Sequence, residues 1–421
     1  MRIYFLFILF LVSGSIWAQE TDSVYIQPVP ETVTSDSLML QFLSQSGVPK
    51  SSDNRVELLM SGRDKFQDLF ASIREAEHHI HMEYFNFRND SIANALFDLL
   101  AVKAAQGVEV RLLFDAFGNW SNNKPLKKRH LKEIRSSGIE IVKFDPINFP
   151  YINHVFHRDH RKIVVLDGRV GYTGGMNIAD YYIHGLPEIG DWRDMHMRIE
   201  GTAVHYLQDI FFSVWNKETK QDIGGPVYYP VVFYADTLHT QTVAVVDRIP
   251  RVSPKLLRRA LAKSIQSAQK SVHIINPYFL PTKLIHKEIK KAIDRGVDVD
   301  IMISSKSDIS FTPDASLYVA HKLMKRGADI YLYDKGFHHS KIMMIDSVFC
   351  TVGSANLNSR SLRYDYETNA FIFDEDTTGE LLDMFADDVE DSTLLTEEKW
   401  KQRSKWKRFV GWFAHLFTPF L

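Results

Sequence analysis

The sequence predicts an α/β protein of two repeated lobes, each a mixed, largely parallel sheet flanked by helices, with the active site between them. Segments of helical spacing alternate with short apolar segments that suit strands, and this alternation occurs twice. The separation of Gly107 and Gly138, 31 positions, equals that of Gly296 and Gly327, and each glycine opens a strand-like stretch. The chain is therefore an internal duplication with an offset near 189 residues, and we expect the lobes to pack face to face.

The elements of each lobe follow from hydrophobic spacing. In the first lobe, helices are expected at 63–73 and 93–105, because apolar side chains recur on one face, and strands at 79–85, 107–115 and 138–142. The second lobe repeats this order with a helix at 253–271 and strands at 272–279, 296–303 and 327–331.

Domain boundaries follow from these elements. We predict a signal peptide or short membrane anchor at 1–18, a linker at 19–54, the first lobe at 55–216, an inter-lobe connection at 217–251, the second lobe at 252–392 and a basic aromatic C-terminal helix at 393–421. The first half carries about ten extra residues around 146–156, which we expect to form a loop at the rim of the site.

Composition limits the possible functions. The 421 residues are 45% hydrophobic, enough for two sizeable cores. The 50 basic and 52 acidic residues leave a net charge of -2, so any affinity for anions must be local. The single cysteine, Cys350, has no partner for an intramolecular disulfide and is expected to be a small buried residue.

One eight-residue motif occurs in both halves. Its spaced residues are His160, Lys162 and Asp167 in the first copy and His339, Lys341 and Asp346 in the second. Each copy continues in the same way, with Gly174-Gly175 and Asn177 in one half and Gly353-Ser354 and Asn356 in the other. A single copy would suit a strand that ends in an ordinary turn, whereas two copies at equivalent places of a repeat indicate two halves of one active site.

The residue types of the motif suit phosphoryl chemistry. Residues i and i+2 of a strand share a face, so each histidine projects with its lysine. Two histidines can act as nucleophile and as acid or base on opposite sides of a phosphorus atom. The candidate phosphate-binding residues are Lys162, Asn177, Lys341 and Asn356. No cofactor or metal is required. Asp167 and Asp346 belong to the candidate catalytic set because they are part of the motif. Their position, however, favours a structural role at the turn.

These residues resemble the phospholipase D superfamily, whose mark is this duplicated motif, and more closely bacterial cardiolipin synthases. The resemblance runs from about residue 56 to 421. It also covers the stretches 79–84, 107–111, 192–196, 276–281 and 367–372.

The resemblance implies a ping-pong phosphatidyl transfer. His160 would attack the phosphodiester of a phospholipid while His339 protonates the departing alcohol, leaving a phosphatidyl-histidine. His339 would then deprotonate a hydroxyl of a second phosphatidylglycerol, whose oxygen displaces His160 and forms cardiolipin. The alcohol that departs in the first step is glycerol. By the same resemblance, Glu367 would orient His160 and Asp194 would orient His339.

Alternatives use the same residues. Water as the acceptor would make the protein a phospholipase D that forms phosphatidic acid. A nuclease or other phosphodiesterase of the superfamily is less favoured, because a nucleic-acid groove should carry clustered positive charge. We therefore expect no nucleic-acid partner, and a phospholipid substrate, with phosphatidylglycerol favoured. A non-catalytic lipid-binding protein would not need every motif residue in both halves.

Both ends of the chain suggest membrane contact. The charged start and apolar residues 3–12 suit a secretory signal with possible cleavage after Ala18, or an uncleaved anchor. The implied location is that of an exported bacterial protein, periplasmic and peripheral or singly anchored at the membrane. Near the other end, aromatic and basic residues at 405–417 recur at helical spacing, which suits a membrane surface or packing on the catalytic body.

Other polar residues are weaker candidates. His78, His79 and His81 resemble a metal cluster, but strand alternation separates His78 from the other two, and no carboxylate or cysteine spacing supports zinc. Glu83 and Asn276 lie at predicted strand ends, where they would support the site or be satisfied interior groups.

Overall fold

The structure is a computed structural model that describes residues 33–146, 156–231, 240–309 and 312–416. Residues from Thr34 onward form one compact unit. The predicted segment 1–18 and most of the predicted rim loop at 146–156 lie outside the described residues.

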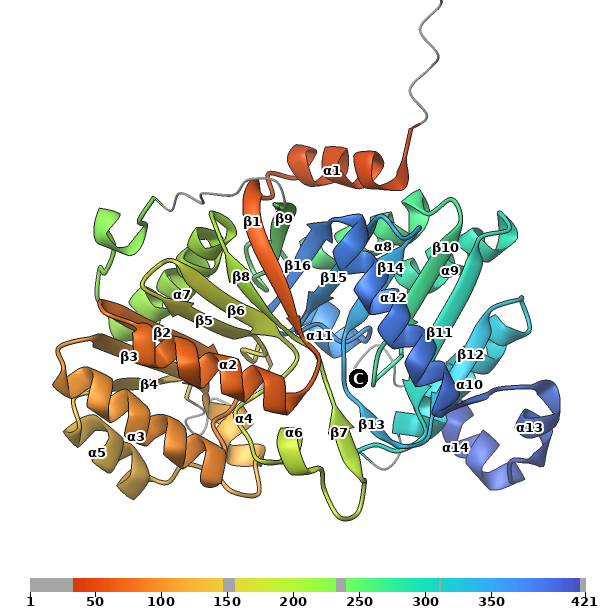
Figure 1. The fold of residues 1–421 in the computed structure, drawn as a ribbon. Helices are drawn as coiled ribbons and strands as arrows, with labels where there is room; N and C mark the ends of the chain where they lie inside the picture. Colours follow the sequence, from red (N-terminus) through yellow and green to blue (C-terminus); the bar gives the residue numbers. More distant parts are fainter. Residues whose placement is uncertain (1–32, 147–155, 232–239, 310–311, 417–421) are drawn as a thin grey trace, which may run out of the picture. The chain divides into compact units, whose positions relative to one another are not determined.

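The first lobe alternates strands and helices as the spacing predicts (Figure 1). Its elements are α1 (Ser35–Gln45), β1 (Lys50–Leu59), α2 (Gly62–Glu75), β2 (His79–Tyr84), α3 (Ser91–Ala105), β3 (Glu109–Asp115), α4 (Ala116–Ser121), α5 (Lys128–Ser136), β4 (Glu140–Phe144), β5 (Lys162–Leu166), β6 (Val170–Gly174), α6 (Tyr181–His184), β7 (Asp191–Arg193), β8 (His196–Glu200) and α7 (Ala203–Thr219). Several helices begin at a side-chain cap: Ser61 accepts from Asp64 N ahead of α2, and Asp90 accepts from Ala93 N ahead of α3.

The second lobe repeats this order after a short 3-10 helix, Pro226–Tyr228. Its elements are β9 (Gln241–Arg248), α8 (Leu256–Ser267), β10 (Ser271–Ile275), α9 (Lys283–Asp294), β11 (Asp298–Ser304), α10 (Thr312–Met324), β12 (Asp329–Tyr333), β13 (Gly336–His338), β14 (Ile342–Ile345), β15 (Phe349–Gly353), α11 (Ser359–Arg363), β16 (Glu367–Phe373), α12 (Glu375–Glu390), β17 (Ser392–Leu394), α13 (Glu397–Gln402) and α14 (Lys405–Leu416).

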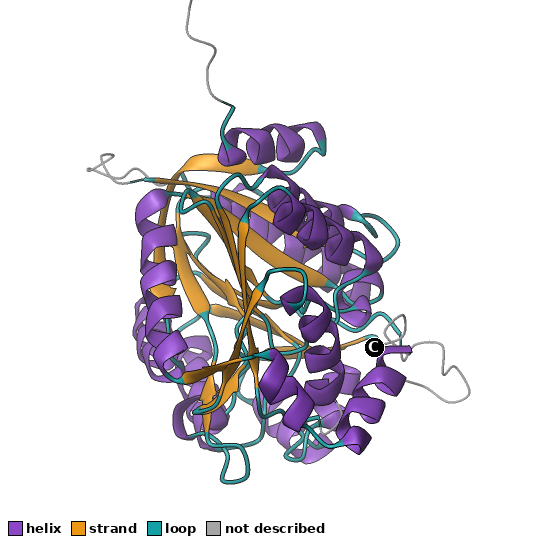
Figure 2. Cartoon of the chain, turned by 90° about the vertical axis from the view of Figure 1, so that its right-hand side faces the viewer, coloured by secondary structure: helices purple, strands orange, loops and turns teal. Residues whose placement is uncertain are grey.

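All strands except β7 and β13 belong to one 15-stranded sheet with the order β17-β12-β11-β10-β14-β15-β16-β9-β1-β8-β6-β5-β2-β3-β4. The run β12-β11-β10-β14-β15-β16 in one lobe matches β4-β3-β2-β5-β6-β8 in the other, and β9 and β1 join them. The α/β class and the duplication are confirmed. Figure 2 shows the strands in the middle of the molecule with helices on both sides.

The prediction of largely parallel sheets is wrong. In each lobe only three neighbouring strands, β2-β3-β4 and β10-β11-β12, pair in parallel, and the other pairs of the large sheet are antiparallel. The motif strand is the cause. Asp167 and Gly168 both take positive φ, of 54° and 66°, and form a tight hairpin, with three residues between the paired Leu166 and Val170, that returns the chain antiparallel.

The lobes share a core. One cluster of buried side chains combines residues of β5 and β8 with residues of β9, β14, β15 and β16, among them Val165, Met197, Val245, Met344 and Cys350. The lobes therefore pack face to face, and Cys350 is fully buried in this layer. The remaining apolar face of the first lobe is covered by its own helices, and that of the second lobe by its own helices together with α1, whose Met39 and Leu43 belong to that core.

The domain division differs from the structure in three places. The predicted linker 19–54 contains α1 and the start of β1, and the predicted connection 217–251 contains β9. Residues 243–246 are buried because they extend the shared sheet. The predicted single helix at 393–421 is two helices, α13 and α14, preceded by strand β17.

The predicted location is corrected. The sequence predicts an exported, periplasmic protein that is peripheral or singly anchored. Among the described residues, no helix has both the length and the apolar character that crossing a bilayer requires. We therefore withdraw the prediction.

Candidate active site

Both motif histidines meet a carboxylate of the other lobe. His160 Nδ1 lies 3.1 and 3.2 Å from the two carboxylate oxygens of Glu367 at the start of β16. His339 Nδ1 lies 2.6 Å from Asp194 Oδ2, directly after β7. The structure thus brings together the pairs that the sequence predicts by resemblance.

Backbone pairing between the lobes sets both contacts. Strands β7 and β13 pair in parallel, with Arg193 opposite His338, and His339 N donates to Arg193 O at 2.6 Å. The other half is built alike: Asp159 bridges in parallel to Tyr366, and His160 N donates to Tyr366 O at 3.1 Å. In each half-site, the histidine directly follows one paired residue and the carboxylate directly follows the other. The histidine and the carboxylate therefore lie side by side.

The two histidines differ in environment. His160 keeps 16% of its side-chain surface exposed and contacts Phe85, whereas His339 keeps 9% and lies among aromatic rings. The rings around His339 are those of Trp192, Tyr278 and Phe337. Burial, together with the charge of Lys341, lowers the pKa of His339 to about 4, against the opposing effect of Asp194.

Both motif lysines are buried beside these groups. Burial lowers the pKa of Lys162 to about 7 and that of Lys341 to about 8, and the Lys341 charge also lowers the pKa of Lys162. Each ammonium group donates to the carbonyl oxygen of its own motif histidine. Lys341 Nζ also lies 2.7 Å from His339 Nδ1. When Asp194 is ionised, His339 Nδ1 carries the proton that it donates to the carboxylate, so this nitrogen cannot accept a hydrogen bond from Lys341. The His339 carbonyl oxygen is then the acceptor for Lys341.

The orienting carboxylates remain acidic despite burial. Burial alone would raise the pKa of Asp194, but Lys341 and His339 lower it below its ordinary value. Burial would likewise raise the pKa of Glu367, but the charge of His160 outweighs this effect, so the pKa is lowered. Both carboxylates are therefore anionic at neutral pH and hold their histidines through Nδ1, leaving Nε2 for chemistry.

One position explains why the repeat is Gly-Gly in one half and Gly-Ser in the other. A Cβ on Gly175 would lie 2.1 Å from Asp194 Oδ1, so only glycine allows the carboxylate to reach His339. At the matching position, the Ser354 hydroxyl donates to Glu367 Oε2. The two half-sites thus fix their carboxylates by different means.

Both predicted phosphate-binding asparagines are buried. Asn177 and Asn356 keep 5% and 6% of their surface exposed, and the Oδ1 atom of each has no hydrogen-bond partner among the described residues. Asn356 and His160 line the same cavity, which has a volume of about 250 Å³. Phe85, Phe117 and Tyr278 form aromatic walls of this cavity, and Arg360 lies over the Phe117 ring.

The motif aspartates take the turn position. Asp167 accepts hydrogen bonds from the backbone N–H groups of residues 77–79, and Asp346 accepts from those of residues 269–271, all at 2.7 to 2.9 Å. They tie the hairpin ends to the starts of β2 and β10. Because their carboxylates are engaged there, we remove Asp167 and Asp346 from the candidate catalytic set.

Buried arginines around the site were not identified from the sequence. Arg161 lies between the motif histidine and lysine, is fully buried, and binds both Asp247 carboxylate oxygens at 2.8 Å and Glu83 at 3.2 Å. Arg158 pairs with Asp145 at 2.6 Å. The only signal in the sequence is a basic residue next to an apolar strand.

The weaker candidates are structural. Glu83 pairs with Arg161, and Asn276 Oδ1 accepts from Leu357 N at 3.1 Å. His79 and His81 are buried on one face and exposed His78 is not with them, as alternation predicts. Within the described part of the chain, no group of three histidine, cysteine or acidic residues could hold a metal ion.

Comparison with known proteins agrees with this architecture. The family model described as "Cardiolipin synthase, PLD-like domain" matches residues 69–215 and 261–389, one segment in each lobe. The chain belongs to this phospholipase D-like family.

Similar proteins cover most of the chain. A "Cardiolipin synthase" of Listeria monocytogenes serotype 4b (strain CLIP80459) is 35% identical over 386 residues, which are 91% of this chain and 79% of that protein. One of Staphylococcus aureus (strain Mu50 / ATCC 700699) is 37% identical over 374 residues, 88% of this chain and 74% of that protein. A crystal structure of phosphatidylserine synthase from Haemophilus influenzae Rd KW20 has the same fold, with a TM-score of 0.68 and 16% identity, over 90% of this chain and 99% of that one.

Exchange of the orienting carboxylates for amides tests their role. We expect Asp194→Asn and Glu367→Gln each to lower turnover by about two to four orders of magnitude, because an amide holds the histidine without stabilising its protonated form. Turnover of a phospholipid substrate would be measured beside Asp383→Asn and Glu380→Gln on the exposed face of α12. Unchanged turnover in both active-site variants would refute the assignment.

The Gly175 and Ser354 positions should respond differently. Gly175→Ala should reduce kcat by about 100-fold or more, because the new Cβ displaces Asp194 from His339.

Ser354→Ala should retain more activity than Gly175→Ala. Loss of the hydroxyl donor raises the pKa of Glu367, so this carboxylate is protonated at a higher pH. On acidification, the variant should therefore lose activity at a higher pH than the native protein.

Gly379→Ala is the matched control for the glycine exchange, since a Cβ there meets nothing within 4 Å. The pH–rate profiles of the three variants and the native protein decide the question. Equal kcat values for Gly175→Ala and Gly379→Ala would contradict the proposed contact.

Proposed function

We propose that the protein transfers a phosphatidyl group between two phosphatidylglycerol molecules, forming cardiolipin and glycerol. The observation that carries the proposal is the pair of histidines, each held through Nδ1 by a carboxylate of the opposite lobe. The 35–37% identity to proteins named cardiolipin synthase supports the choice of substrate.

The first half-reaction would use His160 as the nucleophile. Its Nε2 lone pair attacks the phosphorus atom of one phosphatidylglycerol, while His339 gives a proton to the glycerol oxygen as the P–O bond breaks. Glycerol leaves and phosphatidyl-histidine remains. Lys162, Lys341, Asn177 and Asn356 would bind the non-bridging oxygens.

The second half-reaction reverses the proton transfer. His339, now neutral, accepts the proton of a hydroxyl on a second phosphatidylglycerol, whose oxygen attacks phosphorus and displaces His160. The low pKa of His339, about 4, reflects burial and the charge of Lys341, without a contribution from a substrate. A bound phosphodiester brings a negative charge, which raises the pKa of a nearby imidazole and prepares it to act as the acid.

Restricted access of water favours a lipid acceptor over hydrolysis. Both lysines are buried, His339 is 9% exposed, and the cavity beside His160 has aromatic walls. A lipid hydroxyl would therefore compete with few waters at the phosphorus atom.

We further propose that α14 binds the surface of a phospholipid bilayer. The helix packs on α10, where Gly411 lies against the Asp314 backbone, yet four aromatic side chains are 43–70% exposed. These are Trp406, Phe409, Trp412 and Phe413. Lys405, Lys407 and Arg408 in its first turn would add attraction to anionic lipid, about 1 kcal/mol each.

Product analysis tests the proposed reaction. Purified protein incubated with phosphatidylglycerol should yield cardiolipin and glycerol in equal amounts, separated by chromatography. His160→Ala should abolish turnover, because the covalent intermediate cannot form. Phosphatidic acid as the main product would assign the protein to hydrolysis, and absence of both products would reject both lipid reactions.

Vesicle binding tests α14. Trp406→Ala combined with Trp412→Ala should reduce co-sedimentation with phosphatidylglycerol vesicles several-fold, because two interfacial aromatic rings are lost. Val102→Ser, at an exposed apolar residue of α3, serves as the control. Unchanged co-sedimentation of the double variant would exclude α14 as the bilayer contact.

A further inference from the structure

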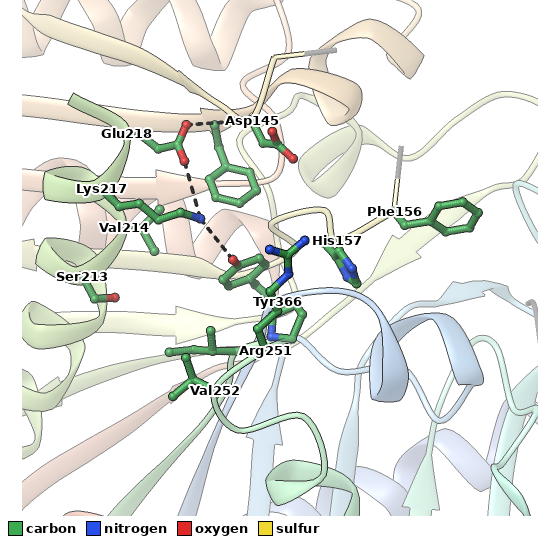
Figure 3. Close-up of a pocket in the computed structure, with 13 residues that line it drawn as sticks. Asp145, Phe156, His157, Ser213, Val214, Lys217, Glu218, Arg251, Val252 and Tyr366 are labelled. Carbon is green, nitrogen blue, oxygen red and sulfur yellow. Dashed lines mark hydrogen bonds and ion pairs between the residues drawn. The ribbon is translucent and has the colours of Figure 1, made fainter. Parts of the chain in front are cut away.

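A second cavity, of about 550 Å³, lies on the other side of the chain segment that positions His160. Its wall includes Tyr366, the residue before Glu367 (Figure 3). Because consecutive side chains of an extended segment point to opposite faces, Glu367 meets His160 while Tyr366 faces this cavity. The two cavities share no described lining residue.

The cavity has an apolar wall with aromatic rings. Phe144 and Tyr366 pack edge to face with ring centroids 5.2 Å apart, and the buried Val214 extends their surface. Two other lining residues, Val252 and Phe156, are 77% and 54% exposed. Large apolar side chains left exposed at a concave site indicate an apolar ligand.

Two cations line the same cavity. Lys217 Nζ lies 3.4 Å from the Tyr366 hydroxyl, and its nearest carboxylate oxygen, on Glu218, is 3.9 Å away. Arg251 is exposed and has no ion-pair partner among the described residues. The two carboxylates of the lining are engaged: Asp145 pairs with Arg158 at 2.6 Å, and Glu218 accepts from Asp145 N at 3.1 Å.

Strained backbone borders the cavity. Asp145 and His157 are not glycines but take φ values of 40° and 74°. Arg158 holds Asp145, and His157 Nδ1 lies 2.8 Å from Tyr364 O. Such residues are costly to maintain and concentrate at ligand sites.

We propose that this cavity is a second phospholipid-binding site, in which an acyl chain lies against Phe144, Val214 and Tyr366 and the phosphate binds Arg251 and Lys217. The choice of a phospholipid rests on the proposed function. The site itself follows from an apolar wall and two cations in its lining, of which Lys217 keeps a 3.9 Å ion-pair contact with Glu218. A lipid bound there would contact Tyr366, whose carbonyl holds the backbone of His160.

Photolabelling tests the proposal without turnover. The full-length chain, native and as His160→Ala, would be mixed with vesicles of phosphatidylcholine and a phosphatidylglycerol that carries a diazirine on one acyl chain. After irradiation, mass spectrometry should find label in peptides 213–218 and 249–252. Because the His160→Ala protein is labelled without reacting, failure of the proposed catalysis would not affect this result.

Two variants test whether the labelling occurs in this cavity. Ser213→Trp places an indole into the cavity from an exposed position of α7 and should suppress label at 249–252 while label on peptides around Phe85 persists. Arg251→Glu should weaken labelling about ten-fold, the effect of losing one charge-assisted contact to phosphate. Lys132→Glu, exposed on α5, is the matched control and should label normally.

The remaining outcomes overturn the proposal. Label confined to peptides around Phe85, or equal label at 249–252 in Ser213→Trp and native protein, would exclude a second lipid site. Displacement of the label by sn-glycerol 3-phosphate would assign the cations to a soluble phosphate. Circular dichroism on each variant separates loss of binding from loss of folding, and the surface variant Arg251→Glu retains the test if Ser213→Trp does not fold.

Discussion

The site depends on parallel backbone contacts between the lobes. In one, His339 N bonds to Arg193 O, and in the other His160 N bonds to Tyr366 O. Each contact places a histidine beside the carboxylate that follows its partner. Side chains alternate along an extended chain, so a shift of one residue between the lobes would turn both carboxylates away from their histidines. The shared core of β5, β8, β14 and β16 prevents that shift, which is why packing and chemistry are linked here.

Burial sets the electrostatics of the site. Two lysines lie out of water next to two carboxylates, and a buried charge is tolerated only where an opposite charge accompanies it. The balance is incomplete, since the pKa values of Lys162 and Lys341 fall to about 7 and about 8. A bound phosphodiester would add a negative charge, which favours the protonated form of both lysines. The site is thus suited to bind the class of substrate that its residues can transform.

The sequence is enough to predict the duplication, the motif residues and their proximity, because spacing repeats between the halves. It predicts the turn position of Asp167 from strand geometry alone. It does not yield strand direction, because a hairpin after the motif changes the order of neighbours in the sheet. The sequence also does not predict the Arg161 contacts, because Glu83 and Asp247 lie 78 and 86 positions away and no local pattern marks them. Asp194 and Glu367 were assigned through family resemblance, since their histidines are 145 and 207 positions distant.

That separation has a consequence for synthesis of the chain. His160 emerges from the ribosome 207 residues before Glu367, so the first lobe is complete in sequence while this histidine still lacks its carboxylate partner. Non-local contacts of this range form late, because closing a long loop costs entropy before the contact compensates it. The growing chain therefore passes through a stage with Lys162 and His160 in place but no paired carboxylate. The proposed nucleophile therefore gains its carboxylate partner only when the second lobe docks.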